Sequence, residues 1–99
     1  MYRGTTPTHT FKTSISLVGA VVLFITYKQK YGIALQKTID DVEITDEVVS
    51  VHLTQQDTLA FKAEAPVSIQ IRARLADGTA VACNIINTNA NLILKDGEI

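Results

Sequence analysis

Residues 66–74 have the sequence Pro66-Val67-Ser68-Ile69-Gln70-Ile71-Arg72-Ala73-Arg74, in which apolar and polar side chains alternate without a break. Because successive side chains of a β-strand point to opposite faces, this stretch predicts a strand with one buried face and one solvent-exposed face. Proline suits the first position, since it cannot donate a hydrogen bond to a neighbouring strand. Asp77-Gly78 is the strongest hairpin signal in the chain, so we expect a partner strand from residue 79 to about residue 84 or 86.

The composition favours sheet structure along the whole chain. Valine, isoleucine and threonine account for 9, 11 and 12 of the 99 residues, and their branched Cβ atoms suit a pleated strand better than a helix. Apolar residues make up 46% of the chain and charged residues 19%, which is too apolar for a disordered segment. A chain of 99 residues can bury one modest core, so the sequence predicts a single domain and excludes a helical bundle and a two-domain enzyme.

Other segments show strand patterns of their own. The strongest is residues 20–30, where both faces are apolar at the start, and this predicts a central strand covered on both sides. Residues 13–27 carry no charge, but they are fewer than the roughly 20 that a membrane-spanning helix needs, so we expect a buried strand and a soluble protein. Shorter strands are expected at residues 8–13, 33–39, 42–44 and 48–53, and the polar residues 87–91 lead to a last strand or terminal clip at 92–94.

One segment departs from the strand pattern. Thr54-Gln55-Gln56-Asp57 places a hydroxyl three residues before a carboxylate, which is similar to a helix capping box with Asp in place of Glu or Gln. Leu53 and the apolar residues after Asp57 would hold such a turn against the core. We therefore expect one short helical turn near residues 54–60 that crosses from one sheet to the other.

These segments together predict an all-β fold, a single small β-sandwich of about seven strands with one helical turn. The sandwich is expected to span residues 7–94. Residues 1–6 show no periodicity and are expected to form a flexible arm, and residues 95–99 a C-terminal tail.

The charged residues are balanced in number but uneven in place. Nine lysines and arginines and ten acids give a net charge of −1, without the strong basic excess typical of nucleic-acid binding. Residues 1–38 contain no acid, whereas residues 39–64 contain seven acids and one lysine. Mutual neutralisation by neighbouring strands explains this best, and an electrostatic docking face is the alternative. The acidic residues 40–47 lack the glycine of a calcium loop, so a solvated turn is favoured over a weak calcium site.

No catalytic, cofactor or metal site is indicated. Cys83, the only cysteine, lies in an apolar stretch and is expected to be a buried, inert thiol. His9 and His52 are not accompanied by a Gly-x-Ser-x-Gly motif, and both are expected on the solvent face of strands. Arg72 and Arg74 should project from one strand face about 7 Å apart. They suit an anion or a nucleic-acid backbone, but solubility and pairing with acidic neighbours is the simpler explanation.

Four segments give the chain a resemblance to a group of small proteins of tailed bacteriophages and prophages, chiefly of Firmicutes. They are MYRGTTPTHTF at residues 1–11, ITYKQ at 25–29, LTQQDTLAF at 53–61, and the end of the chain from IQIR at 69–72 through DGTA at 77–80 to LKDG at 94–97. The likeness spans nearly all of the chain. It implies a virion or morphogenesis component with an immunoglobulin-like β-sandwich and no family active site. Cys83 stands where serine is expected in such proteins, which weakens any catalytic role for the thiol.

The expectation is therefore a non-enzymatic structural protein of a bacteriophage particle, made in the bacterial cytoplasm and located in the virion. It is expected to form homo-oligomers and to contact other virion proteins, with no nucleic-acid, membrane or cofactor partner. Candidate assembly contacts are Tyr2, Arg3, Arg72, Arg74 and Ile99. The alternative is a binding module that recognises carbohydrate or protein on the host surface.

Overall fold

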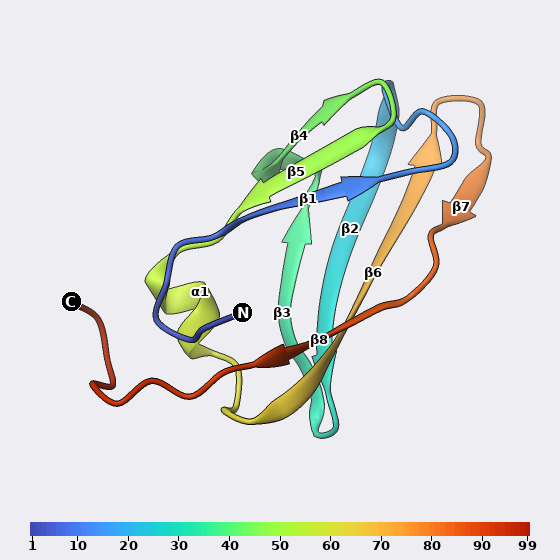
Figure 1. Cartoon of the computed structure of the whole chain (residues 1–99). Coiled ribbons are helices and arrows are strands. Elements are labelled where there is room, and N and C mark those ends of the chain that lie inside the picture. Colours follow the sequence, from blue (N-terminus) through green and yellow to red (C-terminus); the bar gives the residue numbers. More distant parts are fainter.

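A computed structural model describes all residues 1–99 as two antiparallel β-sheets that pack face to face (Figure 1). The smaller sheet has the strand order β1-β5-β4. Its strands are β1 (Thr8–Lys12), β4 (Val42–Thr45) and β5 (Val48–His52). The predicted all-β sandwich is thus confirmed, with eight strands in place of about seven.

The larger sheet has the order β3-β2-β6-β7, and β8 pairs with the other half of β6. Its strands are β2 (Ala20–Gln29), β3 (Gly32–Thr38), β6 (Ala65–Leu75), β7 (Ala80–Ala82) and β8 (Ile86–Ala90). A single 3₁₀ turn, η1 (Ile39–Asp41), leads from β3 into the smaller sheet, and the helix α1 (Gln55–Leu59) leads back from β5 towards β6. The long alternating stretch of the sequence is therefore β6, which pairs with three strands of this sheet: β2, β7 and β8.

The core lies between the two sheets. Strand β6 turns Val67, Ile69 and Ile71 inward, as its alternation predicts. The complete set of buried apolar residues comprises Phe11, Leu17, Leu23, Ile25, Tyr27, Val49, Val51, Leu53, Phe61, Val67, Ile69, Ile71, Ala73 and Ala90. Because these residues come from both sheets and from both ends of α1, the core depends on the crossing at α1 as well as on strand pairing.

The prediction that β2 is covered on both sides is wrong. Leu23, Ile25 and Tyr27 face the core, whereas Phe24, on the opposite face, is 39% exposed. Val21 lies where the pairing of β2 with β6 shifts in register, and it is 50% exposed. A sandwich has only one interior, between its two sheets, so the second apolar face of β2 has no layer to cover it. The outer face of the large sheet consequently carries exposed apolar side chains at this point.

The end of the chain also differs from its prediction. Residues 87–91 were expected to connect strands, but β8 occupies residues 86–90, and residues 92–94 form no strand. Strand β6 is long enough for two partners along one edge, and the backbone of β8 pairs with its first half. The asparagine-rich sequence hides this strand because its side chains are polar while its backbone makes the ladder.

Residues 1–6, expected as a flexible arm, lie along the chain's own surface. Tyr2 forms a parallel bridge with Asn91, and the Met1 ammonium donates a hydrogen bond to the Asn89 carbonyl at 3.0 Å. The Arg3 backbone amide donates to the Asn91 carbonyl. These contacts hold residues 1–3 against residues 89–91, at the end of β8.

The one α-helix, α1, has five residues, and no helix in the structure has the length and hydropathy of a membrane span.

Candidate interaction surfaces

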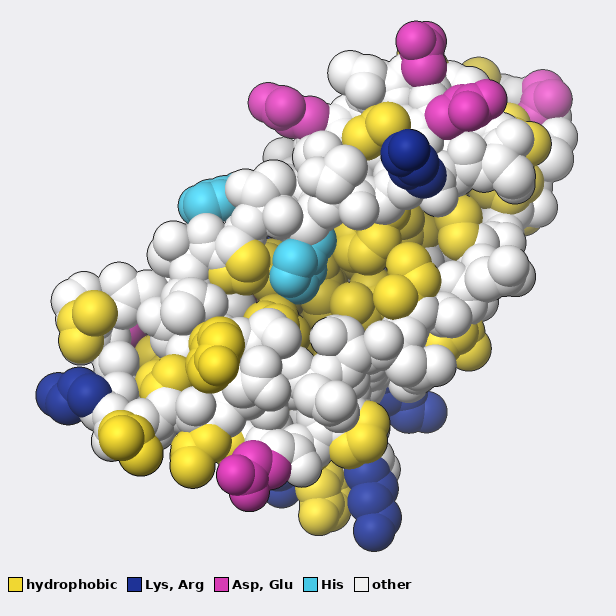
Figure 2. Space-filling view, viewed as in Figure 1, with side chains coloured by type: hydrophobic (Ala, Val, Ile, Leu, Met, Phe, Trp, Pro, Cys, Tyr) yellow, Lys and Arg dark blue, Asp and Glu magenta, His cyan; other side chains and the backbone are white.

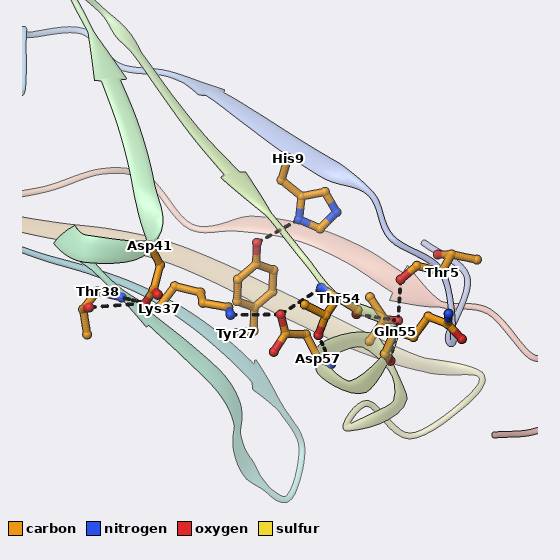
Figure 3. A network of polar contacts seen from close by, with 10 residues as sticks. Thr5, His9, Tyr27, Lys37, Thr38, Asp41, Thr54, Gln55 and Asp57 are labelled. Atoms are coloured by element: carbon orange, nitrogen blue, oxygen red, sulfur yellow. Dashed lines mark hydrogen bonds and ion pairs between the residues drawn. The ribbon is translucent and has the colours of Figure 1, made fainter. Parts of the chain in front are cut away.

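A network of polar contacts ties the two sheets and α1 together (Figure 3). His9 was expected on the solvent face of its strand, but it shares the inner face of β1 with Phe11 and is half-buried. Its Nδ1 lies 2.8 Å from the hydroxyl oxygen of Tyr27, which is fully buried. His52, in contrast, lies exposed on the outer face of β5, as predicted, beside Thr8. The partner of His9 is therefore a core tyrosine, and the pair forms a contact between the two sheets.

Burial decides the ionisation of the His9–Tyr27 pair. It lowers the pKa of His9, and the positive N-terminus lowers it further. Burial also raises the pKa of Tyr27, with a smaller contribution from the Asp57 carboxylate. Both side chains are thus held neutral near neutral pH, which suits a hydrogen bond in a core and does not activate either group as a nucleophile.

The helical turn α1 begins with the predicted capping box. The Thr54 hydroxyl accepts a hydrogen bond from the Asp57 amide, and the Asp57 carboxylate accepts one from the Thr54 amide. The Lys37 ammonium lies 2.9 Å from the same carboxylate. Burial alone would raise the pKa of Asp57, but the Thr54 and Lys37 contacts outweigh it and lower the pKa. The buried hydroxyl of Thr58 donates to the Thr5 carbonyl, which fixes the N-terminal segment to α1.

The sandwich is open on one side, between β1 and the link from β7 to β8. A groove of about 560 Å³ lies there, with mostly apolar walls. Its floor includes the core residues Phe11 and Ile71, and its rim includes Ile15 and Ile86, which are 45% and 47% exposed. Figure 2 shows apolar side chains gathered in this hollow. No local pattern in the sequence predicts the groove, because its walls come from segments more than 50 residues apart.

A second hollow, of about 400 Å³, lies on the outer face of the large sheet. Val22 and Phe24 line it from β2, and their register partners Arg74 and Arg72 line it from β6. Both arginines are exposed, and neither takes part in the two ion pairs of the molecule, Arg3–Asp96 and Lys37–Asp57. The two arginines project from one face, as predicted, but the predicted pairing with acidic neighbours is not found.

The acidic segment forms η1 and the β4–β5 hairpin. Asp40, Glu43, Asp46 and Glu47 are exposed, while the intervening Val42 and Ile44 pack against the core. Acidic side chains gather at the upper end of the molecule in Figure 2, where this hairpin lies. No group of three His, Cys, Asp or Glu side chains is placed to hold a metal ion. The acids of this segment are thus exposed to solvent, and the alternation of the strand turns Val42 and Ile44 towards the core, as the sequence predicted.

The remaining candidate residues fall near α1. The Arg3 guanidinium donates to the carbonyls of Phe61 and Leu59, and it also pairs with Asp96. The backbone of Ile99 forms two hydrogen bonds with the Gln55 amide group, although its side chain is exposed. Arg3 is therefore engaged within its own chain, and it is not placed with the arginines of the outer hollow.

Cys83 is less buried than expected. It is only partly buried and lies on the wall of the open groove, packed against the core. Burial nonetheless raises the pKa of the thiol, which keeps it protonated and unreactive.

Comparisons with protein families, with curated proteins and with solved structures found no match for this chain.

Proposed function

We propose that this chain is a non-enzymatic structural protein of a bacteriophage particle, a building block or adaptor on the head, neck or tail. Its location would be the virion, and its partners would be other virion proteins and further copies of itself. The resemblance in four sequence segments supports the phage assignment. The surface of the sandwich supports the assembly role, because apolar groups that a monomer would cover are left open.

The observation that carries this proposal is the groove on the open side. Single exposed apolar side chains are common on any protein, but a contiguous apolar hollow marks a surface that a partner covers. Here Ile15 and Ile86 form a rim above the core residues Phe11 and Ile71. The neighbouring strand β1 is at the edge of its sheet, so its outer backbone groups are free to pair with another chain.

The strand order supports the immunoglobulin-like type that the resemblance implies. Immunoglobulin domains place strands A, B, E and D in one sheet and strands G, F and C, with C′ in variable-type domains, in the other. The orders β1-β5-β4 and β3-β2-β6-β7 correspond to B-E-D and C′-C-F-G. In this correspondence the place of strand A, beside β1, is empty. That place adjoins the open groove.

The tyrosines favour this role over a carbohydrate-binding module. A carbohydrate site usually offers exposed aromatic rings on which a sugar can stack. Tyr27 is buried in the core. Tyr31 and Tyr2 are exposed, but one face of the Tyr31 ring carries the Lys62 ammonium at 3.8 Å, and Tyr2 lies on another segment, bridged to Asn91. Binding of the purified protein to a glycan array would favour the alternative, and we expect none.

Genetic complementation tests the assembly role. We expect a phage with a stop codon in this gene to form defective particles, and the wild-type gene to rescue them. Ile15→Asp places a charge in the groove, whereas Ile33→Asp places the same charge on β3, where the side chain is 63% exposed. Rescue by Ile33→Asp and not by Ile15→Asp is the expected result. Normal particles from the stop-codon phage would overturn the proposal.

A further inference from the structure

We propose that a second copy of this chain docks its acidic β4–β5 hairpin into the arginine-rimmed hollow on the outer face of the large sheet. This inference rests on the proposed assembly function and deepens it by naming the partner and both surfaces. The hollow is defined by Val22, Phe24, Arg72 and Arg74. The acidic hairpin is defined by Glu43, Asp46 and Glu47.

The hollow combines an apolar floor with a cationic rim. Phe24 is 39% exposed, and it stands beside Arg72 across the β2–β6 ladder, just as Val22 stands beside Arg74. The two arginines have no carboxylate within ion-pair distance. Arginine and aromatic side chains are enriched at the centres of protein interfaces, where a bidentate guanidinium can pair with a carboxylate. A fitting partner therefore carries at least two carboxylates on a narrow projection.

The chain itself supplies such a projection. The β4–β5 hairpin is a tight turn between two strands of four and five residues, and it ends in Asp46-Glu47. Glu43 lies on the outward face of β4, next to this turn. The hairpin belongs to the smaller sheet, whereas the hollow is on the outer face of the larger sheet, so the two charged surfaces of one molecule do not neutralise each other. They are free to meet between copies.

Charge complementarity selects a second copy as the occupant. Opposite charges that are segregated on two faces of a nearly neutral molecule, of net charge −1, attract another copy of the same molecule. The contact is heterologous, since different surfaces meet, so repetition of it closes a ring or extends a row. Rings and rows are the arrangements that a building block of a particle requires.

Charge-reversal variants test the contact. Arg72→Glu/Arg74→Glu changes the hollow, and Glu43→Lys/Glu47→Lys changes the hairpin; Asp46 is left in place because its φ of +22° makes substitution a risk to the turn. Lys30→Glu/Lys95→Glu is the matched control, because it reverses two exposed lysines outside both surfaces. Circular dichroism and thermal melting would establish that each variant is folded.

Sedimentation velocity over a range of protein and salt concentrations is the measurement. We expect the wild type and the control to self-associate, less so at high salt. Each charge-reversal variant alone should show an increase in Kd of about tenfold or more. In an equimolar mixture, contacts between two copies of the same variant are repelled for both variants. The native hairpin of the first variant can still pair with the native hollow of the second. The mixture should therefore form a 1:1 complex.

Three results would overturn the inference: a monomeric wild type at every concentration and at low salt, wild-type association by either charge-reversal variant, or a mixture that remains monomeric. None of these results would overturn the proposed function, which is tested by whether particles contain and need this protein. Conversely, if normal particles form without this protein while the purified protein still self-associates, the proposed function is overturned and the contact between copies is supported.

Discussion

His9 Nδ1 and the hydroxyl oxygen of Tyr27 lie 2.8 Å apart, and this hydrogen bond joins the edge strand β1 of one sheet to the strand β2 of the other. The His9 and Tyr27 ring centroids are 5.7 Å apart, and that of Phe61 is 5.6 Å from Tyr27. The pair is thus a polar contact within an otherwise apolar interface between the sheets. It makes the stability of the sandwich sensitive to the ionisation of one histidine.

Acidification should destabilise the protein through His9. Its pKa in the folded state lies below the ordinary value of 6.5, because burial and the positive N-terminus oppose protonation. The unfolded chain therefore binds this proton more readily, and the free energy of unfolding should fall as the pH drops from above 6.5 through the folded-state pKa. Urea unfolding at a series of pH values measures this change.

Two variants separate His9 from the other histidine. His9→Gln keeps a hydrogen-bonding group but cannot ionise in this range, so it should flatten the pH dependence. His52→Gln should keep it, because His52 is exposed on the outer face of β5. An unchanged pH profile in the His9→Gln variant would show that another group is responsible.

Removal of the Tyr27 hydroxyl should lower the free energy of unfolding, because His9 then loses its hydrogen-bond partner. Tyr27→Phe keeps the ring in the core and leaves a half-buried Nδ1 without its partner, and we expect a loss of about 1–3 kcal/mol. In a double-mutant cycle with His9→Gln, the two losses should not add, since each variant disrupts the same contact. Strictly additive losses would mean that the hydrogen bond contributes nothing.

A buried and an exposed position of β2 should respond unequally to truncation. Leu23→Ala opens a cavity in the core and should cost about 2–5 kcal/mol, whereas Val21→Ala, at the register shift where the side chain is 50% exposed, should change the stability by only about 0.5 kcal/mol. Chemical denaturation of the two single variants gives both values. Equal, large losses would indicate that the Val21 side chain is covered in the folded protein.

The capping box of α1 should be needed to hold the crossing between the sheets. Thr54→Ala removes the acceptor for the Asp57 amide and should cost about 1 kcal/mol. Thr54→Ser keeps the acceptor and serves as the control, with little loss.

Asp57 should make the same turn sensitive to strong acid. Its pKa is held below the usual carboxyl value of 3.8, so the stability that it contributes is present above that pH and is lost as the pH falls through the folded-state pKa. Asp57→Asn should shrink this loss in thermal melts between neutral and acidic pH. If the Asp57→Asn variant lost as much stability in acid as the wild type, other carboxylates would be responsible for the loss.

Much of the fold could be predicted because its signals are local. The alternation in residues 66–74, the Asp77-Gly78 turn and the Thr54–Asp57 capping box each lie within a few residues, and each forms the expected element. The inward orientation of His9 could also have been inferred, because a period of two places it on the same face as Phe11.

The parts that could not be predicted depend on contacts between distant segments. β8 exists because β6 has room for a second partner, and the N-terminal segment is ordered because Asn89 and Asn91 offer backbone acceptors. Neither fact is visible in the polar sequence of these segments. The groove likewise forms only when Ile15 and Ile86, 71 positions apart in the sequence, meet across the open side.

The central claim, that this chain is a structural component of a phage particle, is tested most directly by quantitative mass spectrometry of purified particles of a phage that encodes it. We expect the protein to co-purify with intact particles through a density gradient, at a fixed copy number relative to the major capsid protein. Its absence from particles, together with its abundance as free protein in the same lysate, would contradict a structural role in the particle.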